Sequence, residues 1–357
     1  MPRVQGCDAF RVTMRRGGRP ESILVRLTGD NGAVGWGEAP VRSHDAGPGE
    51  ADGSIWADIE ERLAPALLGV DWDRPEDVAG VAQLGGRGAA AAIDIACWDL
   101  WCRARRVPLA HALGGTRTAV VVGARITVQT SLESLVSRVN SFVGAGYARV
   151  TVAIRPGWDI EPIRAVRRAY PALALVADAG GGYTEAREHL AALSALDGYG
   201  LLAIERPFRA DDLAAHARLQ GRIATPLCPY VGDLEALDAA IGLDAGRALH
   251  LRIAPLGGLT AARSGHDRAY AAGWDVWCGE AGAFGIGQAA AIALAGLPGC
   301  TLPSDVAETG DGPAFVTPPV RASGGVMAVP FTQPGLGHTV NGPAVARLAT
   351  QTVRIPA

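Results

Sequence analysis

From about residue 120 onward the chain repeats one pattern, a short apolar stretch with strand character followed by an amphipathic helical stretch. Strands and helices that alternate in this way form parallel βαβ units, and seven or eight such units close into a TIM-type barrel. The expected strands are 120–128, 149–154, 174–178, 201–205, 225–228, 248–253, 275–278 and 299–302. Such a barrel places its active site at the carboxyl ends of its strands, so residues there are the first functional candidates.

The residues before the barrel follow a different pattern, with three strands around a Gly-Asp-Asn-Gly turn and then two helices. These strands and helices are expected at 10–14, 22–27, 33–38, 50–68 and 87–106. The tail is rich in proline and glycine, and we expect it to return to the N-terminal unit. The sequence therefore predicts an α+β capping domain at 1–118, a barrel at 119–315 and a C-terminal segment at 316–357.

Composition excludes several classes of protein. Hydrophobic residues make up 48% of the 357 residues and charged residues 19%, which suits a large buried core. The net charge of −3, with scattered basic residues, predicts neither a nucleic acid nor a membrane as partner. The six cysteines form no CxxC motif, and we expect free thiols in the cytoplasm.

The chain contains no lysine, so all of its 33 basic side chains belong to arginine. Arginine stays protonated in proteins, and it therefore serves neither as an ordinary general base nor as an imine-forming amine. GC-rich coding is one general cause, because it also favours the abundant alanine and glycine. That cause does not decide what stands at individual catalytic positions.

A series of short motifs resembles a known family. They are Gly35-Trp36-Gly37-Glu38, 91–100, Leu113-Gly114-Gly115, 146–159, 199–205, Gly257-Gly258-Leu259, 276–279, 302–305 and 334–337. Together they cover nearly the whole chain and resemble the enolase superfamily. Within it the chain is most similar to the muconate-lactonising group, in the branch of the o-succinylbenzoate synthases and N-succinylamino acid racemases. The resemblance implies a capped TIM-type barrel and a homo-oligomer.

The same resemblance implies a chemistry. Family members bind Mg²⁺ through three carboxylates at the ends of the third, fourth and fifth barrel strands. Lysines on the second and sixth strands move a proton next to a substrate carboxylate, while the metal stabilises the enediolate. This chemistry requires a hard cation, oxygen ligands and a base of lowered pKa.

Carried onto this chain, the metal site is only partly present. Asp178 and Glu205 match the first two ligands, whereas Tyr230 stands where the third is expected. A shifted Asp233 is the alternative third ligand. Two carboxylates make a poor Mg²⁺ site, so we expect no cofactor, with Mg²⁺ at Asp178, Glu205 and Asp233 as the disfavoured alternative.

The lysine positions are changed as well. Those on the second strand read Thr151 and Ala153, and the one on the sixth strand reads Arg252. Arg125 stands on the first strand where the family has a small residue, and Glu280 stands on the seventh where it has glycine. None of the residues at the three lysine positions can replace lysine as the base.

These changes predict a network in place of the metal, in which Arg125 and Arg252 pair with Asp178 and Glu205. The expected catalytic residues are Glu280, Tyr230, Asp178 and Glu205. The expected substrate-binding residues are Arg125, Arg252, Thr151 and His44, the last in a polar loop at 41–53 that suits a lid. For Arg206 and His250 the pattern leaves open whether they face the pocket, and Asp305 matches a scaffold aspartate.

The functional prediction is a divergent, metal-independent enzyme of specialised metabolism. It is expected to carry out an isomerisation, elimination or cyclisation on a small carboxylate or an N-acyl amino acid-like molecule. A catalytically inactive protein that binds a small molecule or a partner protein is the main alternative. A Mg²⁺-dependent o-succinylbenzoate synthase or N-acylamino acid racemase is less favoured, since it would still lack its lysine bases.

Overall fold

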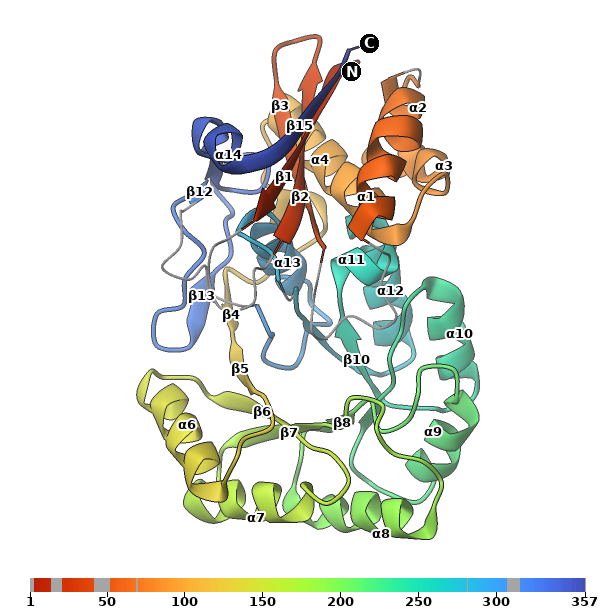
Figure 1. Cartoon of the computed structure of the whole chain (residues 1–357), viewed down its shortest axis with the longest axis vertical. Coiled ribbons are helices and arrows are strands. Elements are labelled where there is room, and N and C mark those ends of the chain that lie inside the picture. Colours follow the sequence, from red (N-terminus) through yellow and green to blue (C-terminus); the bar gives the residue numbers. More distant parts are fainter. Residues whose placement is uncertain are drawn as a thin grey trace.

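The computed structural model describes residues 3–13, 21–41, 52–68, 70–280, 282–306 and 315–356. It has an α+β cap built on an antiparallel sheet and, below the cap in Figure 1, a barrel of alternating strands and helices. The predicted fold class, a capped TIM-type barrel, is confirmed. His44 and most of the expected lid loop lie outside the described residues.

The cap sheet combines both ends of the chain. Its strand order is β15-β1-β2-β3, with β1 (Val4–Thr13), β2 (Glu21–Gly29), β3 (Val34–Pro40) and β15 (Ala349–Pro356). β15 pairs antiparallel with β1, and Figure 1 shows the two termini at the same end of the molecule. The C-terminal strand therefore completes a sheet begun by the first three. The domain boundaries at 118/119 and 315/316 stay a prediction.

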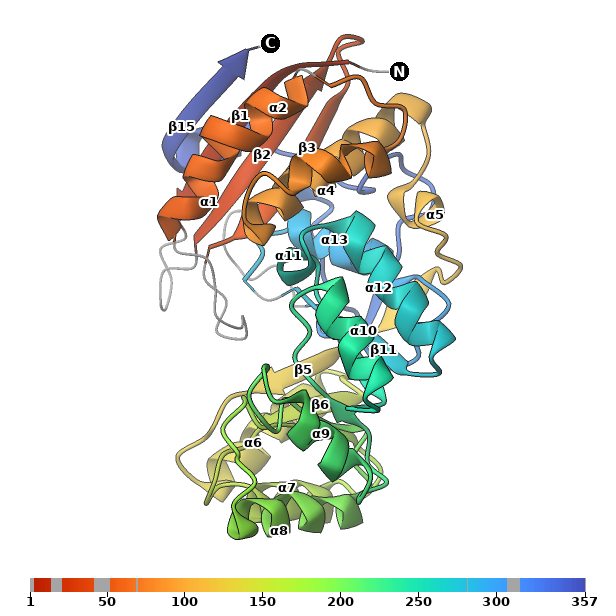
Figure 2. The same cartoon turned by 90° about the vertical axis from the view of Figure 1, so that its right-hand side faces the viewer.

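The cap helices are α1 (Asp52–Asp58), the π-helical turn η1 (Ile59–Leu63), α2 (Ala64–Leu68), the 3₁₀ helix η2 (Pro75–Val78), α3 (Ala79–Ala82), α4 (Arg87–Arg105) and α5 (Leu109–Ala112). Of these, α1, α2 and α4 cover one face of the sheet (Figure 2). The long helix α4 lies directly on β3 because Gly35 and Gly37 have no Cβ atom. A Cβ at Gly37 would overlap the carbonyl group of Ala92 in α4.

The barrel strands appear close to their expected positions. They are β5 (Gly123–Ile126), β6 (Arg149–Ala153), β7 (Ala174–Asp178), β8 (Ala203–Glu205), β9 (Leu227–Cys228), β10 (Ala248–Leu251) and β11 (Asp275–Cys278). The short strand β4 (Ala119–Val121) precedes them and pairs antiparallel with a strand of the C-terminal segment. β5 to β9 form one parallel sheet and β10 pairs with β11. The Arg247 amide donates to the Leu227 carbonyl at 3.0 Å and joins the two sheets.

Closure of the barrel differs from the expectation at one place. The eighth strand was expected at 299–302, but single bridges at Ser304 and Asp305 close the ring instead. Ser304 pairs with Val122 and Asp305 pairs with Gly279, just after β11. The shift places the Asp305 carboxylate beside the strand ends, where it matters for the site.

The remaining helices surround the barrel, and a C-terminal segment of short strands leads back to the cap. The helices are α6 (Leu132–Gly144), α7 (Ile160–Ala169), α8 (Arg187–Leu196), η3 (Asp197–Tyr199), α9 (Leu213–Gln220), α10 (Leu234–Gly242), α11 (Ile253–Leu256), α12 (Leu259–Ala271) and α13 (Ile286–Ala295). The segment contains β12 (Val316–Thr317), β13 (Val326–Ala328), β14 (Thr339–Val340) and α14 (Gly342–Leu348). Within the described part of the chain, no helix combines the length and apolarity that crossing a membrane requires.

Candidate active site

Three carboxylates meet at one end of the barrel. Asp178 is the last residue of β7 and Glu205 the last of β8, and the parallel register places them side by side. Asp305 joins them through its bridge to Gly279. All three residues are at least nine-tenths buried. Three like charges in such a place repel one another unless cations offset them.

Arg125 supplies the central cation. It lies on β5, and its Nη2 atom is 2.7 Å from Asp178 Oδ2, while Nη1 is 2.9 Å from both Glu205 Oε2 and Asp305 Oδ2. Nη2 also donates to Glu205 Oε2 at 3.0 Å. One guanidinium therefore binds all three carboxylates, and charge-assisted hydrogen bonds of this kind are strong.

Two further arginines complete the charge balance. Arg206 Nη2 lies 2.6 Å from Asp178 Oδ2, and its Nε atom donates to Asp178 Oδ1 at 3.1 Å. Arg149 is fully buried, donates to Asp305 and stacks over Trp277 at 5.4 Å. Three guanidinium groups thus face three carboxylates. This neutral arrangement is what allows so many charges to be buried together.

His250 orients Glu205 from the other side. Its Nδ1 atom lies 2.7 Å from Glu205 Oε1, and its ring stacks on Trp277 at 5.1 Å. Burial lowers the pKa of His250, and the neighbouring Glu205 carboxylate only partly opposes this effect. The neutral ring then donates from Nδ1 to the carboxylate. Within the described part of the chain, Nε2 is buried without a hydrogen-bond partner.

Two carboxylates of this network, Glu205 and Asp305, stay ionised. Burial opposes the ionisation of Glu205, but Arg125, His250 and Arg206 outweigh it and hold the pKa of Glu205 well below its usual range. Burial also opposes the ionisation of Asp305, and the nearby arginines still lower the pKa of that carboxyl. Both groups are therefore fixed anions near neutral pH and not proton carriers.

Glu280 has the opposite character. It is 5% exposed just beyond β11, and its Oε2 atom accepts from the backbone amides of Ile253 at 3.0 Å and Ala254 at 3.4 Å. Burial raises the pKa of Glu280 to about 7, and the nearby Glu38 adds to this, while the two amides and Arg252 oppose it. A carboxyl group that titrates near neutral pH is suited to proton transfer.

Glu38 supports Glu280 from the cap. It ends the Gly-Trp-Gly-Glu motif on β3, and it accepts from the amides of Phe284 at 2.5 Å and Gly287 at 2.9 Å at the start of α13. Burial raises the pKa of Glu38 despite these hydrogen bonds. A Cβ at Gly287 would lie 3.6 Å from both Glu280 Cγ and Glu38 Oε2, so the two acidic side chains flank this glycine.

Replacing Glu280 with glutamine should make the protein more stable at alkaline pH. The pKa of Glu280 is raised, so its contribution to stability is complete below its ordinary pKa near 4.5 and is lost as the pH rises through about 7. Chemical unfolding measures this effect: from pH 5 to pH 8.5 the parent protein should lose about 2.5 kcal/mol of stability that the Glu280→Gln variant keeps. The exposed Glu188→Gln on α8 is the control, and an equal gain there would refute the buried charge.

Arg252 and Tyr230 lie together on the Glu280 side. The Arg252 guanidinium stacks over the Tyr230 ring at 4.7 Å, as in a cation–π pair. Arg252 was expected to pair with Asp178 and Glu205, and that pairing stays a prediction, whereas Arg206, for which no place had been settled, pairs with Asp178. Arg252 stands at the N-terminal end of the short helix α11.

The other predicted residues occupy distinct places. Thr151 is the register partner of Arg125 and accepts from Arg149 at 2.7 Å, so it belongs to the base of the network. Asp233 caps α10 through the Ala236 amide and pairs with Arg87 at 2.7 Å. It is therefore engaged outside the group of three carboxylates. The functional roles assigned to all these residues stay predictions.

The arrangement does not fit a bound Mg²⁺ ion. Mg²⁺ needs about six oxygen ligands at roughly 2.1 Å, and the point where Asp178, Glu205 and Asp305 converge is filled by Arg125. Among the residues that the structure describes, no group of three or more His, Cys, Asp and Glu side chains is arranged to hold a metal.

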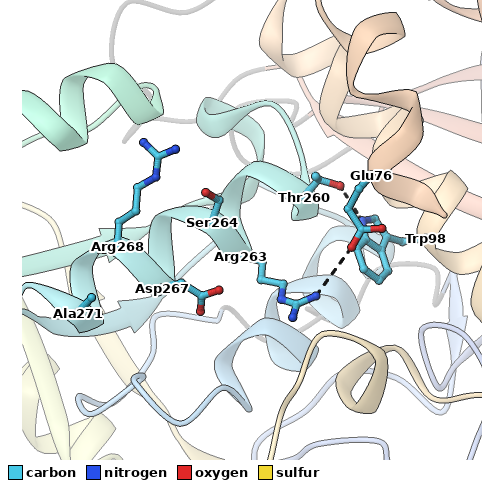
Figure 3. Close-up of a pocket in the computed structure, with 8 residues that line it drawn as sticks. All are labelled: Glu76, Trp98, Thr260, Arg263, Ser264, Asp267, Arg268 and Ala271. Carbon is cyan, nitrogen blue, oxygen red and sulfur yellow. Dashed lines mark hydrogen bonds and ion pairs between the residues drawn. The ribbon is translucent and has the colours of Figure 1, made fainter.

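A separate surface pocket lies on the outer side of the barrel (Figure 3). It measures about 500 Å³ and is lined by Glu76, Trp98, Thr260, Arg263, Ser264, Asp267, Arg268 and Ala271. These residues come from η2, α4 and α12, and Arg263 pairs with Glu76 across it at 3.8 Å. None of the strand-end residues lines this pocket, so it is distinct from the candidate active site.

Two residues of the network were not assigned from the sequence. Arg149 could have been found, because it stands two positions before Thr151 and so shares its strand face. Arg206 follows Glu205 and should point away from it, but a backbone φ of 50° turns its side chain back to Asp178. This left-handed conformation is uncommon for arginine and leaves no trace in the sequence.

Comparison with known proteins agrees with the geometry. Residues 7–114 match the mandelate racemase / muconate lactonizing enzyme N-terminal domain, and residues 134–345 match the enolase C-terminal domain-like family. An o-succinylbenzoate synthase of Geobacillus kaustophilus is 38% identical over 92% of this chain and 88% of its own length. An N-succinylamino acid racemase of Thermus thermophilus is 36% identical over 91% and 89%. A Listeria innocua enolase-superfamily structure covers all of both chains with a TM-score of 0.92 at 28% identity.

These relatives correct the prediction about cofactors. The chain was expected to use none, but the o-succinylbenzoate synthases and the N-succinylamino acid racemase to which it is similar are Mg²⁺-dependent. That prediction is therefore wrong as it was made. The chain belongs to the mandelate racemase / muconate lactonizing enzyme family of the enolase superfamily, as an enzyme related to o-succinylbenzoate synthase and N-succinylamino acid racemase.

Proposed function

We propose that this chain is a divergent member of its family. Its substrate is a small carboxylate or an N-acyl amino acid-like molecule, from which the enzyme removes a proton and to which it returns one. The reaction is an isomerisation, an elimination or a cyclisation. The observation that supports it is the buried Glu280 carboxyl, with a pKa of about 7, at the carboxyl end of the barrel strands. The substrate class is supported by the N-succinylamino acid racemase among the relatives.

The residues around Glu280 suggest how a substrate would bind. Glu280 accepts and returns the proton, because near neutral pH both of its protonation states are populated. The Arg252 guanidinium offers a planar pair of donors to the substrate carboxylate, and the Tyr230 ring beneath it fixes its orientation. The Tyr230 hydroxyl is the second candidate for a proton donor. This assignment uses groups that are present in the chain and needs no lysine.

The charged network has a different role in this proposal. Asp178 and Glu205 form part of the wall of the site, and Arg125 and Thr151 hold that wall in place. The oxygen atoms of these carboxylates are hydrogen-bonded to guanidinium groups. In this proposal the two residues therefore orient the substrate and exclude water, and they do not carry the transferred proton. His44 remains a candidate lid residue.

Exchange of the α-proton tests the proposal directly. The purified protein, with either 5 mM MgCl₂ or EDTA, is mixed in D₂O with a panel of N-succinyl-L-amino acids, and the loss of the α-proton signal is followed by NMR. We expect exchange by the parent protein and at least about a 100-fold slower rate in Glu280→Gln, because the proton acceptor is missing. Chiral chromatography of the same samples reports whether exchange leads to racemisation.

The controls separate the outcomes. Glu188→Gln, on the exposed face of α8, should exchange protons at the parent rate. Exchange that survives in Glu280→Gln would remove Glu280 from the mechanism. A parent protein that binds the compounds without exchange would contradict the enzymatic proposal and favour a protein that only binds small molecules.

We also infer a homo-oligomer located in the cytoplasm, by analogy with the related enzymes. The six cysteines are buried free thiols, in keeping with a reducing compartment. Light scattering coupled to size-exclusion chromatography measures the oligomeric state, and a monomer at micromolar concentration would contradict it.

A further inference from the structure

Arg125 uses all the hydrogens of its terminal nitrogens on carboxylates. Nη1 donates to Glu205 Oε2 and Asp305 Oδ2, and Nη2 donates to Asp178 Oδ2 and again to Glu205 Oε2. Each Nη atom of a guanidinium carries two hydrogens, so these four bonds account for every one. The three carboxylates thus present one oxygen each to a single cation.

The second oxygen of each carboxylate is hydrogen-bonded to another side chain. His250 binds Glu205 Oε1, Arg149 binds Asp305 Oδ1, and Arg206 Nε binds Asp178 Oδ1. Groups that orient ligands in this way are the usual support of a cation site. The convergence of the three oxygens is therefore built into the barrel and does not depend on Arg125 alone.

Removing the Arg125 charge would leave three carboxylates facing two guanidinium groups, so one negative charge would be uncompensated. Arg206 would still neutralise Asp178 and Arg149 would still neutralise Asp305. Glu205 would keep the 4.0 Å contact with Arg206 and the His250 hydrogen bond. A buried carboxylate with so little compensation needs a cation.

We propose that the Arg125 side chain is a built-in cation that competes with a divalent metal ion for Asp178, Glu205 and Asp305. A metal ion would meet the same three oxygen atoms that Arg125 now binds, so the two are mutually exclusive. The side chain of Arg125 is 21% exposed, which gives it a route out towards solvent. Arg125 thereby sets the metal affinity of the site.

A second observation points to an incomplete centre. His250 Nε2 is buried and has no hydrogen-bond partner within the described part of the chain, and it lies 3.9 Å from Asp305 Oδ2. A nitrogen with an available lone pair beside three carboxylates adds a donor that metal ions accept. It is left unused while Arg125 occupies the centre.

Mn²⁺ binding tests this competition without any assay of turnover. Metal-free parent protein, Arg125→Ser and Arg125→Gln are titrated with Mn²⁺, and free Mn²⁺ is followed by electron paramagnetic resonance. We expect each variant to bind one Mn²⁺ at least 10-fold more tightly than the parent protein. Arg125→Lys keeps a cation at this position and should bind Mn²⁺ as weakly as the parent.

Two further Mn²⁺ titrations test the proposal even if a single variant folds poorly. The parent protein alone must bind Mn²⁺ weakly, so tight binding there would overturn the proposal whatever the variants do. Equal affinity in the parent and in Arg125→Gln would also overturn it. The double variant R125S/D305N should lose the gain, and a gain that persists would place the ion away from these carboxylates.

Discussion

An alanine at position 37 should lower the free energy of unfolding by more than about 4 kcal/mol. Gly37 lies where α4 crosses β3, and a Cβ there would overlap the backbone of Ala92 and approach the amide of Ala96 at 2.9 Å. Backbone atoms of a helix cannot rotate out of the way as a flexible side chain can. The helix would have to move off the sheet, which opens the core of the cap.

Urea unfolding followed by circular dichroism measures this effect. Gly80→Ala is the matched control, because nothing lies within 4 Å of a Cβ at that position in α3. That variant should keep the parent stability or gain up to about 1 kcal/mol. A Gly37→Ala protein as stable as Gly80→Ala would show that α4 does not lie on β3 as described.

Replacing Arg149 with methionine should cost about 3–5 kcal/mol. Arg149 is fully inside the barrel, where it pairs with Asp305 and stacks on Trp277. Methionine fills part of the space but leaves the buried Asp305 carboxylate with less positive charge nearby. An uncompensated buried charge is far more costly than the pair itself is stabilising.

The control is an ion pair of the same kind at the surface. Arg164 pairs with Glu161 on α7, and both side chains are about half exposed. Arg164→Met should therefore change stability far less than Arg149→Met does. The double variant R149M/D305N should recover part of the loss seen in Arg149→Met. A single variant within 1 kcal/mol of the parent protein would contradict the role of Arg149 as a necessary counter-charge.

The sequence predicted the barrel and the central pairing because both follow from short-range rules. Alternation of strands and helices indicates βαβ units, and residues at strand ends share one edge. Asp178, Glu205 and Arg125 were placed by that rule together with a count of charges. The structure brings these three together as expected.

The remaining parts of the site depend on features that the sequence does not display. The turn at Arg206 is a backbone conformation, and Arg252 lies over the Tyr230 ring at the start of a short helix. Glu38 reaches the Glu280 region across more than 240 residues of chain. No local pattern links positions so far apart, and only the closed fold shows that they meet.

The hydrogen bonds from Phe284 and Gly287 to Glu38 also bear on how this architecture can change during evolution. A cap residue holds the first turn of a barrel helix beside the Glu280 carboxyl, which we propose as the proton carrier, so the proposed site depends on both domains. Exchanging the cap with that of a relative would alter the acidity of Glu280 unless the glutamate and the glycine it binds were inherited together. Recombination between family members should therefore succeed with both domains transferred as a pair, and a barrel separated from its cap is not an interchangeable module.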